Sequence, residues 1–348
     1  MIAPETGVFF TTYQADRRLH RLPFARLAML TFLAVLYVVV PLVASPYQIY
    51  VLDTLLVATI GALGLNLLTG YAGQISIGHG GFIGVGAFTS AILVSKLGVP
   101  LAISVPAAGL LTAGLGLLVG LPSLRIKGLY LAIATLAAQV IIDWALSRPA
   151  IAGTGSVAAP RPGLLQPDRA YYVVLLSVTI LAVIGIENLL RTRLGRALIA
   201  VRDQDIAASV IGVSVGRYKL LAFGLSSFYA GVAGALLGHL NGAVNFEQFQ
   251  LDLSIQYLAM IVIGGLGSIP GAIFGAVFVS LLPILLRNLA GTLDGLVGGG
   301  SSGLLSSLQL FLFGLVIVLF MTLEPRGLAR IWRSLKDAIR LWPFSHEG

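Results

Sequence analysis

Long apolar stretches, separated by short polar or glycine-rich segments, dominate the chain. Each stretch is close to the roughly 20 residues that an α-helix needs to cross a bilayer. The pattern predicts an all-α, polytopic membrane protein with about ten transmembrane helices. The candidate spans are residues 26–44, 50–69, 76–95, 101–120, 129–147, 171–190, 219–240, 254–268, 270–289 and 305–323.

Composition places the chain in a bilayer and not in water. Hydrophobic residues make up 57% of the sequence and charged residues 10%, against roughly 25% charged in soluble domains. The 348 residues are largely used by the spans, so no room remains for a soluble nucleotide-hydrolysing domain. The sequence also contains no GxxxxGK[ST] loop, so any coupling to ATP has to come from a partner.

The positions of the basic residues indicate which loops lie on the cytoplasmic side of the membrane. They lie between apolar segments and do not form one patch, which excludes a nucleic-acid partner. With the N-terminus inside, seventeen Lys and Arg residues fall on the cytoplasmic side and five outside, as the positive-inside rule requires. Both termini are therefore expected in the cytoplasm. The predicted parts are a cytoplasmic N-terminal segment 1–25, a permease domain 26–323 with an external loop 148–170 and a cytoplasmic loop 191–219, and a cytoplasmic amphipathic tail 324–348.

The glycine-rich segment Gly70–Gly86 places polar side chains at membrane depth. It is expected either as a full span or as a broken, re-entrant helix, since irregular backbone in a membrane has to face protein or a wet cavity. Broken helices also expose N–H groups that bind carboxylates. The side chains expected along a solute path are Gln74, Ser76, His79 and Thr135; for His79, an internally satisfied histidine is the alternative.

Catalysis finds little support in the sequence. The four histidines are scattered, and neither an HExxH nor a GxSxG motif occurs, so an intramembrane enzyme lacks its nucleophile or metal ligands. No cysteine is present to bind a metal, and we expect no cofactor. A proton-driven carrier usually needs carboxylates in mid-membrane, and the sequence has no ladder of them.

Four segments carry a resemblance to a known family. Residues 195–223 read GRALIAVRDQDIAASVIGVSVGRYKLLAF. This stretch resembles the cytoplasmic coupling loop of branched-chain amino-acid ABC transporter permeases of the LivM type. The blocks Gly70–Gly86, Arg125–Ala137 and Ile263–Gly271 agree with the same family, and together the four cover the chain from about Leu52 to Leu286.

The resemblance implies a subunit that translocates branched-chain or related amino acids across the bacterial inner membrane and performs no chemistry itself. Its partners would be a second permease subunit, two cytoplasmic ATPases and an exported or periplasmic solute-binding protein. The coupling residues carried over from the matched loop are Arg202, Asp203, Asp205, Ala207, Ala208 and Gly212. Urea or short amides remain alternative substrates, and a secondary transporter or channel that acts without ATPases remains an alternative class.

Overall fold

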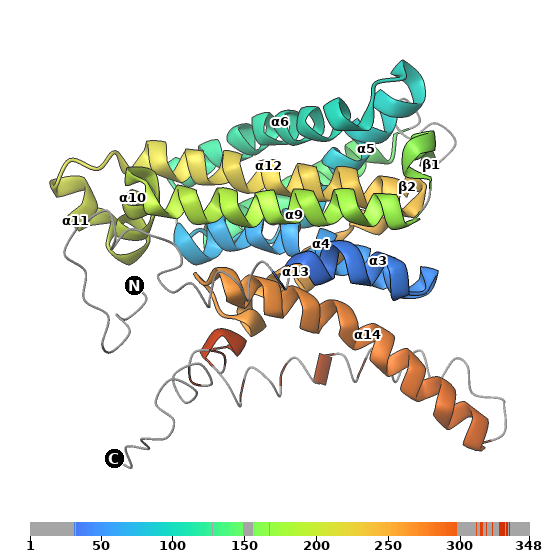
Figure 1. Ribbon diagram of the computed structural model, residues 1–348. Helices are drawn as coiled ribbons and strands as arrows, with labels where there is room; N and C mark the ends of the chain where they lie inside the picture. The colour runs from blue at the N-terminus through green and yellow to red at the C-terminus, as the bar shows by residue number, and fades with distance from the viewer. Residues whose placement is uncertain are drawn as a thin grey trace, which may run out of the picture.

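The computed structural model describes residues 31, 33–126, 128–148, 156–166 and 168–297, together with scattered positions between 311 and 334. The described chain is a bundle of helices (Figure 1). In chain order the longer helices are α4 (Pro46–Asn66), α5 (His79–Leu97), α6 (Leu101–Gly120), α7 (Leu129–Leu146), α9 (Asp168–Arg191), α12 (Val215–Asn241), α13 (Leu251–Gly264) and α14 (Ile269–Val297).

Shorter elements complete the described part of the chain. A π-helical turn η1 (Val35–Val39) leads into α3 (Val40–Val43), and a second π-helical turn, η2 (Leu67–Tyr71), extends α4. Two short helices, α10 (Arg193–Asp203) and α11 (Asp205–Val210), precede α12. Strand β1 (Ser156–Ala158) pairs antiparallel with β2 (Ala243–Asn245). Three-residue to four-residue 3₁₀ turns are η3 (Leu121–Leu124), η4 (Gly163–Leu165) and η5 (Phe246–Phe249).

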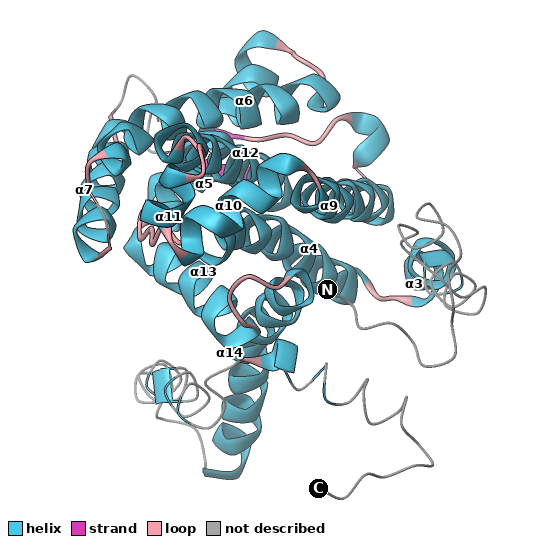
Figure 2. Ribbon diagram, turned by 90° about the vertical axis from the view of Figure 1, so that its left-hand side faces the viewer, coloured by secondary structure: helices cyan, strands magenta, loops and turns pink. Residues whose placement is uncertain are grey.

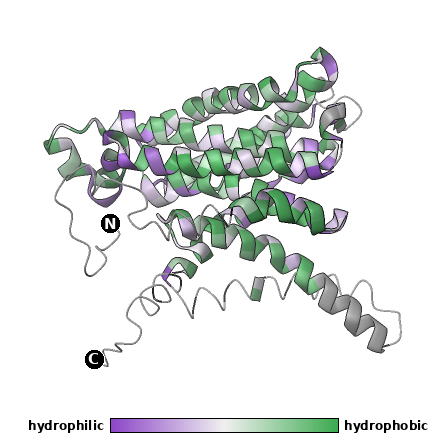
Figure 3. Ribbon diagram, viewed as in Figure 1, coloured by the Kyte–Doolittle hydropathy of each residue, from purple (hydrophilic) through white to green (hydrophobic). Residues whose placement is uncertain are grey.

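Seven helices of the described ranges are long and apolar enough to cross a membrane. They correspond to seven of the predicted spans, from 50–69 to 171–190, together with 219–240 and 270–289. The chain is thus a multi-pass helical protein, as the apolar pattern predicts. Polar residues gather at the two ends of the bundle and apolar residues cover its length (Figure 3).

The other three predicted spans have different outcomes. Helix α13 has 14 residues, about 21 Å at 1.5 Å per residue, and is too short by itself for a hydrocarbon core of roughly 30 Å. The predicted span 26–44 is described only in part, and 305–323 lies outside the described residues except for isolated positions. A total of ten spans and the side on which each terminus lies stay predictions.

Helix α12 is the centre of the bundle. In the view along the helices it lies among α4, α5, α6 and α9, while α7 and α14 lie at the periphery (Figure 2). Glycines permit the close approach: a Cβ at Gly234 would collide with the backbone carbonyl of Ile83, and one at Gly86 with the backbone of Gly231. This contact between α5 and α12 explains the small-residue spacing of the sequence, because backbone contact replaces a hydrophobic driving force between helices in lipid.

Two broken helical units run in opposite directions. Helix α4 and η2 run to the end of the bundle that carries α11 (Figure 1), and residues 72–78 return the chain to the inside of the bundle, where His79 at the start of α5 contacts the carbonyl oxygen of Gly61. Helix α12 runs to the opposite end, and residues 243–250, which include β2 and η5, return the chain to the inside of the bundle, where α13 begins. The first turns of α5 and α13 touch, because the Gly80 amide donates a 2.7 Å hydrogen bond to Ser254 Oγ. The helix is thus interrupted between Tyr71 and His79, whereas α5 is itself long enough to cross a membrane; whether Gly70–Gly86 is a full span or re-entrant stays a prediction.

Candidate functional site

Helix α11 projects from one end of the bundle (Figure 1). Three large apolar side chains on and after it are exposed: Ile206 is 71%, Val210 81% and Ile211 77% accessible. The turn back into α12 is made at Gly212, whose φ of +86° favours glycine. An apolar surface on a short helix between polar segments is typical of a protein interface.

The predicted coupling residues divide into inward and outward groups. Ala207 is exposed, whereas Ala208 is 2% accessible and packs inward. Asp205 lies 3.7 Å from the ammonium of Lys219 at the start of α12, which ties α11 to the central helix. Asp203 is exposed and accepts a 2.8 Å hydrogen bond from Arg202 Nε.

Sequence reasoning missed Ile206, Val210 and Ile211, although all three lie inside the matched loop. The available signal was three apolar residues at positions i, i+4 and i+5 in a segment that also carries Asp205 and Arg217. In a helix, positions i and i+4 share one face, and Ile211 follows directly after the helix. This signal predicts a contact surface better than the small size of Ala207 and Ala208 does.

The return segment 72–78 brings buried polar groups to the inside of the bundle. Burial alternates along it: Gln74 is 3% and Ser76 1% accessible, whereas Ile75 between them is exposed. Among the described residues, three side-chain atoms of this segment have no hydrogen-bond partner: Gln74 Nε2, Gln74 Oε1 and Ser76 Oγ. Each buried unpaired group costs about 1–3 kcal/mol, so this conformation leaves the polar atoms of Gln74 and Ser76 unsatisfied.

His79 and Thr135 are instead satisfied inside the subunit. His79 Nε2 lies 3.0 Å from the carbonyl oxygen of Gly61, and its ring meets Tyr257 edge-on at 5.5 Å. Thr135 Oγ1 accepts the Ile77 amide at 3.0 Å and donates to the Ala132 carbonyl. The structure thus brings all four predicted path residues to one break in the backbone but shows two of them holding it in place. Their contact with a solute stays a prediction.

A polar network joins the first turns of α5 and α13. The oxygen of the Gln139 side chain accepts hydrogen bonds from the Gly81 amide and Ser254 Oγ, and its nitrogen donates to the Phe249 carbonyl at 2.8 Å. The nitrogen also donates to Asp143 Oδ1 at 2.9 Å. Three of these partners, Gly81, Phe249 and Ser254, lie more than 50 residues from Gln139 in the chain, so periodicity could not identify them; the fourth, Asp143, is four residues away.

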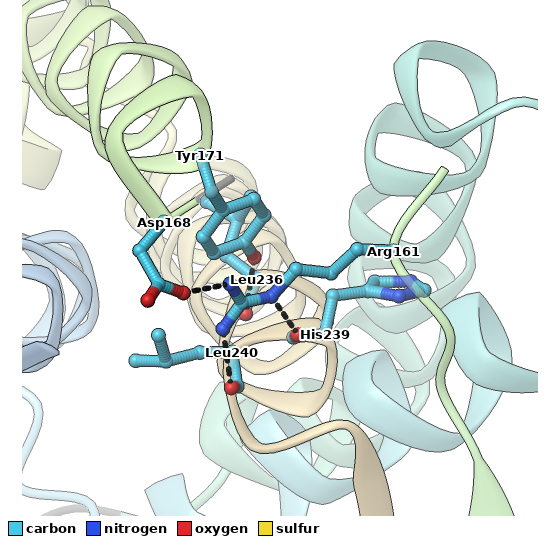
Figure 4. Close-up of polar contacts among 6 residues, drawn as sticks. All are labelled: Arg161, Asp168, Tyr171, Leu236, His239 and Leu240. Atoms are coloured by element: carbon cyan, nitrogen blue, oxygen red, sulfur yellow. Dashed lines mark hydrogen bonds and ion pairs between the residues drawn. The ribbon is translucent and has the colours of Figure 1, made fainter. Parts of the chain in front are cut away.

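A guanidinium fixes the opposite end of α12 (Figure 4). Arg161 Nε donates to the His239 carbonyl at 2.9 Å and Nη2 to the Leu240 carbonyl at 2.7 Å, while Nη1 pairs with Asp168 at 2.8 Å. The same group stacks on Tyr171, with 4.5 Å from Cζ to the ring centroid. These bonds satisfy carbonyls at a helix C-terminus, where a positive charge is also favoured by the helix dipole.

Comparison with known proteins identifies the family. Residues 47–321 match a family described as "Branched-chain amino acid transport system / permease component". The chain belongs to this family. The chain is similar to the high-affinity branched-chain amino acid transport system permease protein LivM of Escherichia coli (strain K12), with 34% identity over 269 residues, 69% of this chain and 63% of the relative. It therefore spans less than two thirds of that relative's length.

Shorter similarities extend to other permeases of the same kind. The LivH permease protein of Escherichia coli (strain K12) is 35% identical over 97 residues, 28% of this chain and 31% of the relative. The autoinducer 2 import system permease protein LsrC of Enterobacter sp. (strain 638) is 34% identical over 96 residues, 28% of each chain. No solved structure matches the chain.

Proposed function

We propose that this chain is a permease subunit of an ABC importer, embedded in a bacterial inner membrane, that translocates branched-chain amino acids. The observation that carries the proposal is the projecting α11 with its exposed Ile206, Val210 and Ile211, in a chain that belongs to a transport-system permease family. One of two cytoplasmic ATPase subunits would hold α11. A second permease subunit and an exported or periplasmic solute-binding protein would complete the importer.

The apolar side chains of α11 are suited to a groove on an ATPase. Large apolar groups that a partner buries supply much of the binding free energy of an interface, and Asp205 with Lys219 fixes the direction in which the helix points. ATP would act on the permease by making its partners bind one conformation better than the other. On this proposal, 191–219 is cytoplasmic and 148–170 external, in agreement with the charge distribution.

The break at residues 72–78 is the proposed solute path. Non-helical backbone at mid-depth is tolerated only against protein or water, and the exposed Ile75 lies on its outer side. The unpaired polar atoms of Gln74 and Ser76 would gain partners when water or the amino acid enters. Transporters commonly place such breaks near mid-membrane for this purpose.

The substrate class rests on the relatives. LivM and LivH are both named as permeases for branched-chain amino acids, and the longer match is to LivM. Leucine, isoleucine and valine are therefore the proposed solutes.

Reconstitution in vesicles tests the function. The chain, assembled with its companion subunits and binding protein, should accumulate labelled leucine only when ATP is supplied to the ATPases. Ile206→Asp should abolish both co-purification of the ATPases and uptake. Leu97→Asp introduces the same charge at an exposed apolar position in another part of the molecule, and should retain both. Uptake by this chain alone would contradict the proposal and indicate a secondary carrier, whereas ATP-driven uptake of urea but not of leucine would contradict the substrate.

A further inference from the structure

Arg202 contacts the inside of the permease and not the projecting tip of α11. Its Nη1 donates a 2.9 Å hydrogen bond to the carbonyl oxygen of Gly70, 132 residues away in the chain. We propose that Arg202 is a positioning residue that transmits movement of the α10–α11 region to the broken helix beside it. This inference rests on the proposed coupling of α11 to an ATPase.

Two glycine turns contact one side of Arg202, whose side chain is 36% accessible and also pairs with Asp203. A Cβ at Gly73 would lie 2.9 Å from Arg202 Cγ, and a Cβ at Gly267 would lie 2.9 Å from Arg202 Nη1. Both glycines have positive φ, +68° and +70°, a conformation that side chains disfavour. The Arg202 side chain therefore lies against backbone atoms of two non-helical segments, the return segment 72–78 and the turn between α13 and α14.

The acceptor of this hydrogen bond belongs to an unusual turn. Gly70 lies in η2, the π-helical end of α4, and π-helical turns are rare and frequently occur at functional sites. A carbonyl at a helix C-terminus also carries the negative end of the helix dipole, which favours a cation there. Gln74 follows four residues later, and its backbone N–H donates a 3.0 Å hydrogen bond to the carbonyl oxygen of Leu68. A shift of Arg202 would consequently reach the backbone that carries the unpaired Gln74 side chain.

Asn66, at the end of α4, is bonded to the turn between α13 and α14. Its Oδ1 accepts the Gly267 amide at 2.9 Å, and its Nδ2 donates to the Ser268 carbonyl at 3.0 Å. The end of α4 and the turn between α13 and α14 are thus linked, and Arg202 touches both. Movement of this one guanidinium would therefore act on the end of α4 and on the turn between α13 and α14 at the same time. A packed group that contacts two regions in this way can couple their conformations.

A docking role for Arg202 predicts a different result from a transmitting role. If Arg202 bound the ATPase, its loss would weaken assembly as Ile206→Asp does. If Arg202 transmits movement instead, Arg202→Gln should leave ATPase co-purification and ATP hydrolysis close to wild type. The amount of solute transported per ATP hydrolysed should fall by about tenfold, which is the size of a typical coupling free energy. Arg202→Lys keeps a charged donor and should recover part of the loss. Arg196→Gln, on the same helix and bonded to the nearby Arg191 carbonyl, is the matched control.

A thiol-labelling experiment reads the movement directly. The chain has no cysteine, so Ile75→Cys introduces its sole thiol at an exposed position of the return segment. In the assembled complex, the maleimide labelling rate of this thiol should change when a non-hydrolysable ATP analogue is added. With Arg202→Gln in the same chain, the rate should no longer respond to the analogue.

Each outcome is decisive for Arg202. The proposal would be overturned if Arg202→Gln lost ATPase co-purification while its membrane content and melting temperature stayed at the wild-type values. It would also be overturned if the labelling response persisted in Arg202→Gln, or if no response occurred with Arg202 intact. Failure of the unmodified complex to assemble with ATPases or to take up leucine would instead refute the proposed function itself. The two failures are distinguishable, because labelling and uptake are measured separately.

Discussion

At the scale of single residues, two buried glutamines illustrate opposite uses of a polar side chain. Gln139 is 1% accessible, and its amide bonds with Gly81, Phe249, Ser254 and Asp143. Gln74 is 3% accessible, and among the described residues its amide atoms have no partner. A satisfied group stabilises the fold, whereas an unpaired one costs free energy and is retained for another reason.

The same substitution at both positions should therefore have opposite effects on stability. Gln139→Leu removes the partners of buried backbone groups and should destabilise the protein by about 2–4 kcal/mol. Gln74→Leu replaces an unpaired amide by an apolar group of similar size, and should leave the melting temperature unchanged or higher while reducing uptake. Thermal unfolding in detergent and uptake in vesicles check the pair. A Gln74→Leu protein that unfolds as readily as Gln139→Leu would show that Gln74 has a structural role.

At the scale of elements, the apolar pattern predicts helix positions but not where a helix breaks inside the bundle. The run 254–268 reads as one span, yet α13 occupies Leu251–Gly264, because the turn after it is held by Asn66 from another helix. The break before α5 is indicated by the glycines of Gly70–Gly86, but its supports, Thr135 and Ser254, come from distant segments. Hydropathy reports contact with lipid, and long-range polar pairing leaves no periodic signal.

The contact between α5 and α12 gives a prediction at this scale. Gly234→Ala places a methyl group against the Ile83 carbonyl and should push the helices apart, at a cost of about 1–3 kcal/mol typical of overpacking. Gly114 on α6 is the matched control, because a Cβ there meets nothing within 4 Å. Gly114→Ala should be neutral or slightly stabilising, since alanine favours a helix. Equal melting temperatures for the two variants would contradict the packing described for α12.

At the scale of the whole molecule, α12 connects the two ends of the bundle. Its first turns are tied to α11 through Lys219 and Asp205, and its last carbonyls are held by Arg161. The resemblance of residues 195–223 predicts an ATPase contact at the end that carries α11, and this contact stays a prediction. The exposed Ile206, Val210 and Ile211 were missed although their spacing is visible in the sequence, because apolar residues in a membrane protein predict burial or lipid contact until the helix that carries them is located.

A photo-crosslinking amino acid at Val210 tests the central claim most directly. This position is 81% accessible on α11 and should be covered by an ATPase subunit in the assembled importer. Irradiation of intact cells should join this chain to a nucleotide-hydrolysing subunit, with the yield lowered by Ile206→Asp and unaffected by Leu97→Asp. A crosslink to a protein outside the cytoplasm, or none to an ATPase while the same residue is labelled freely from the external side, would contradict the account.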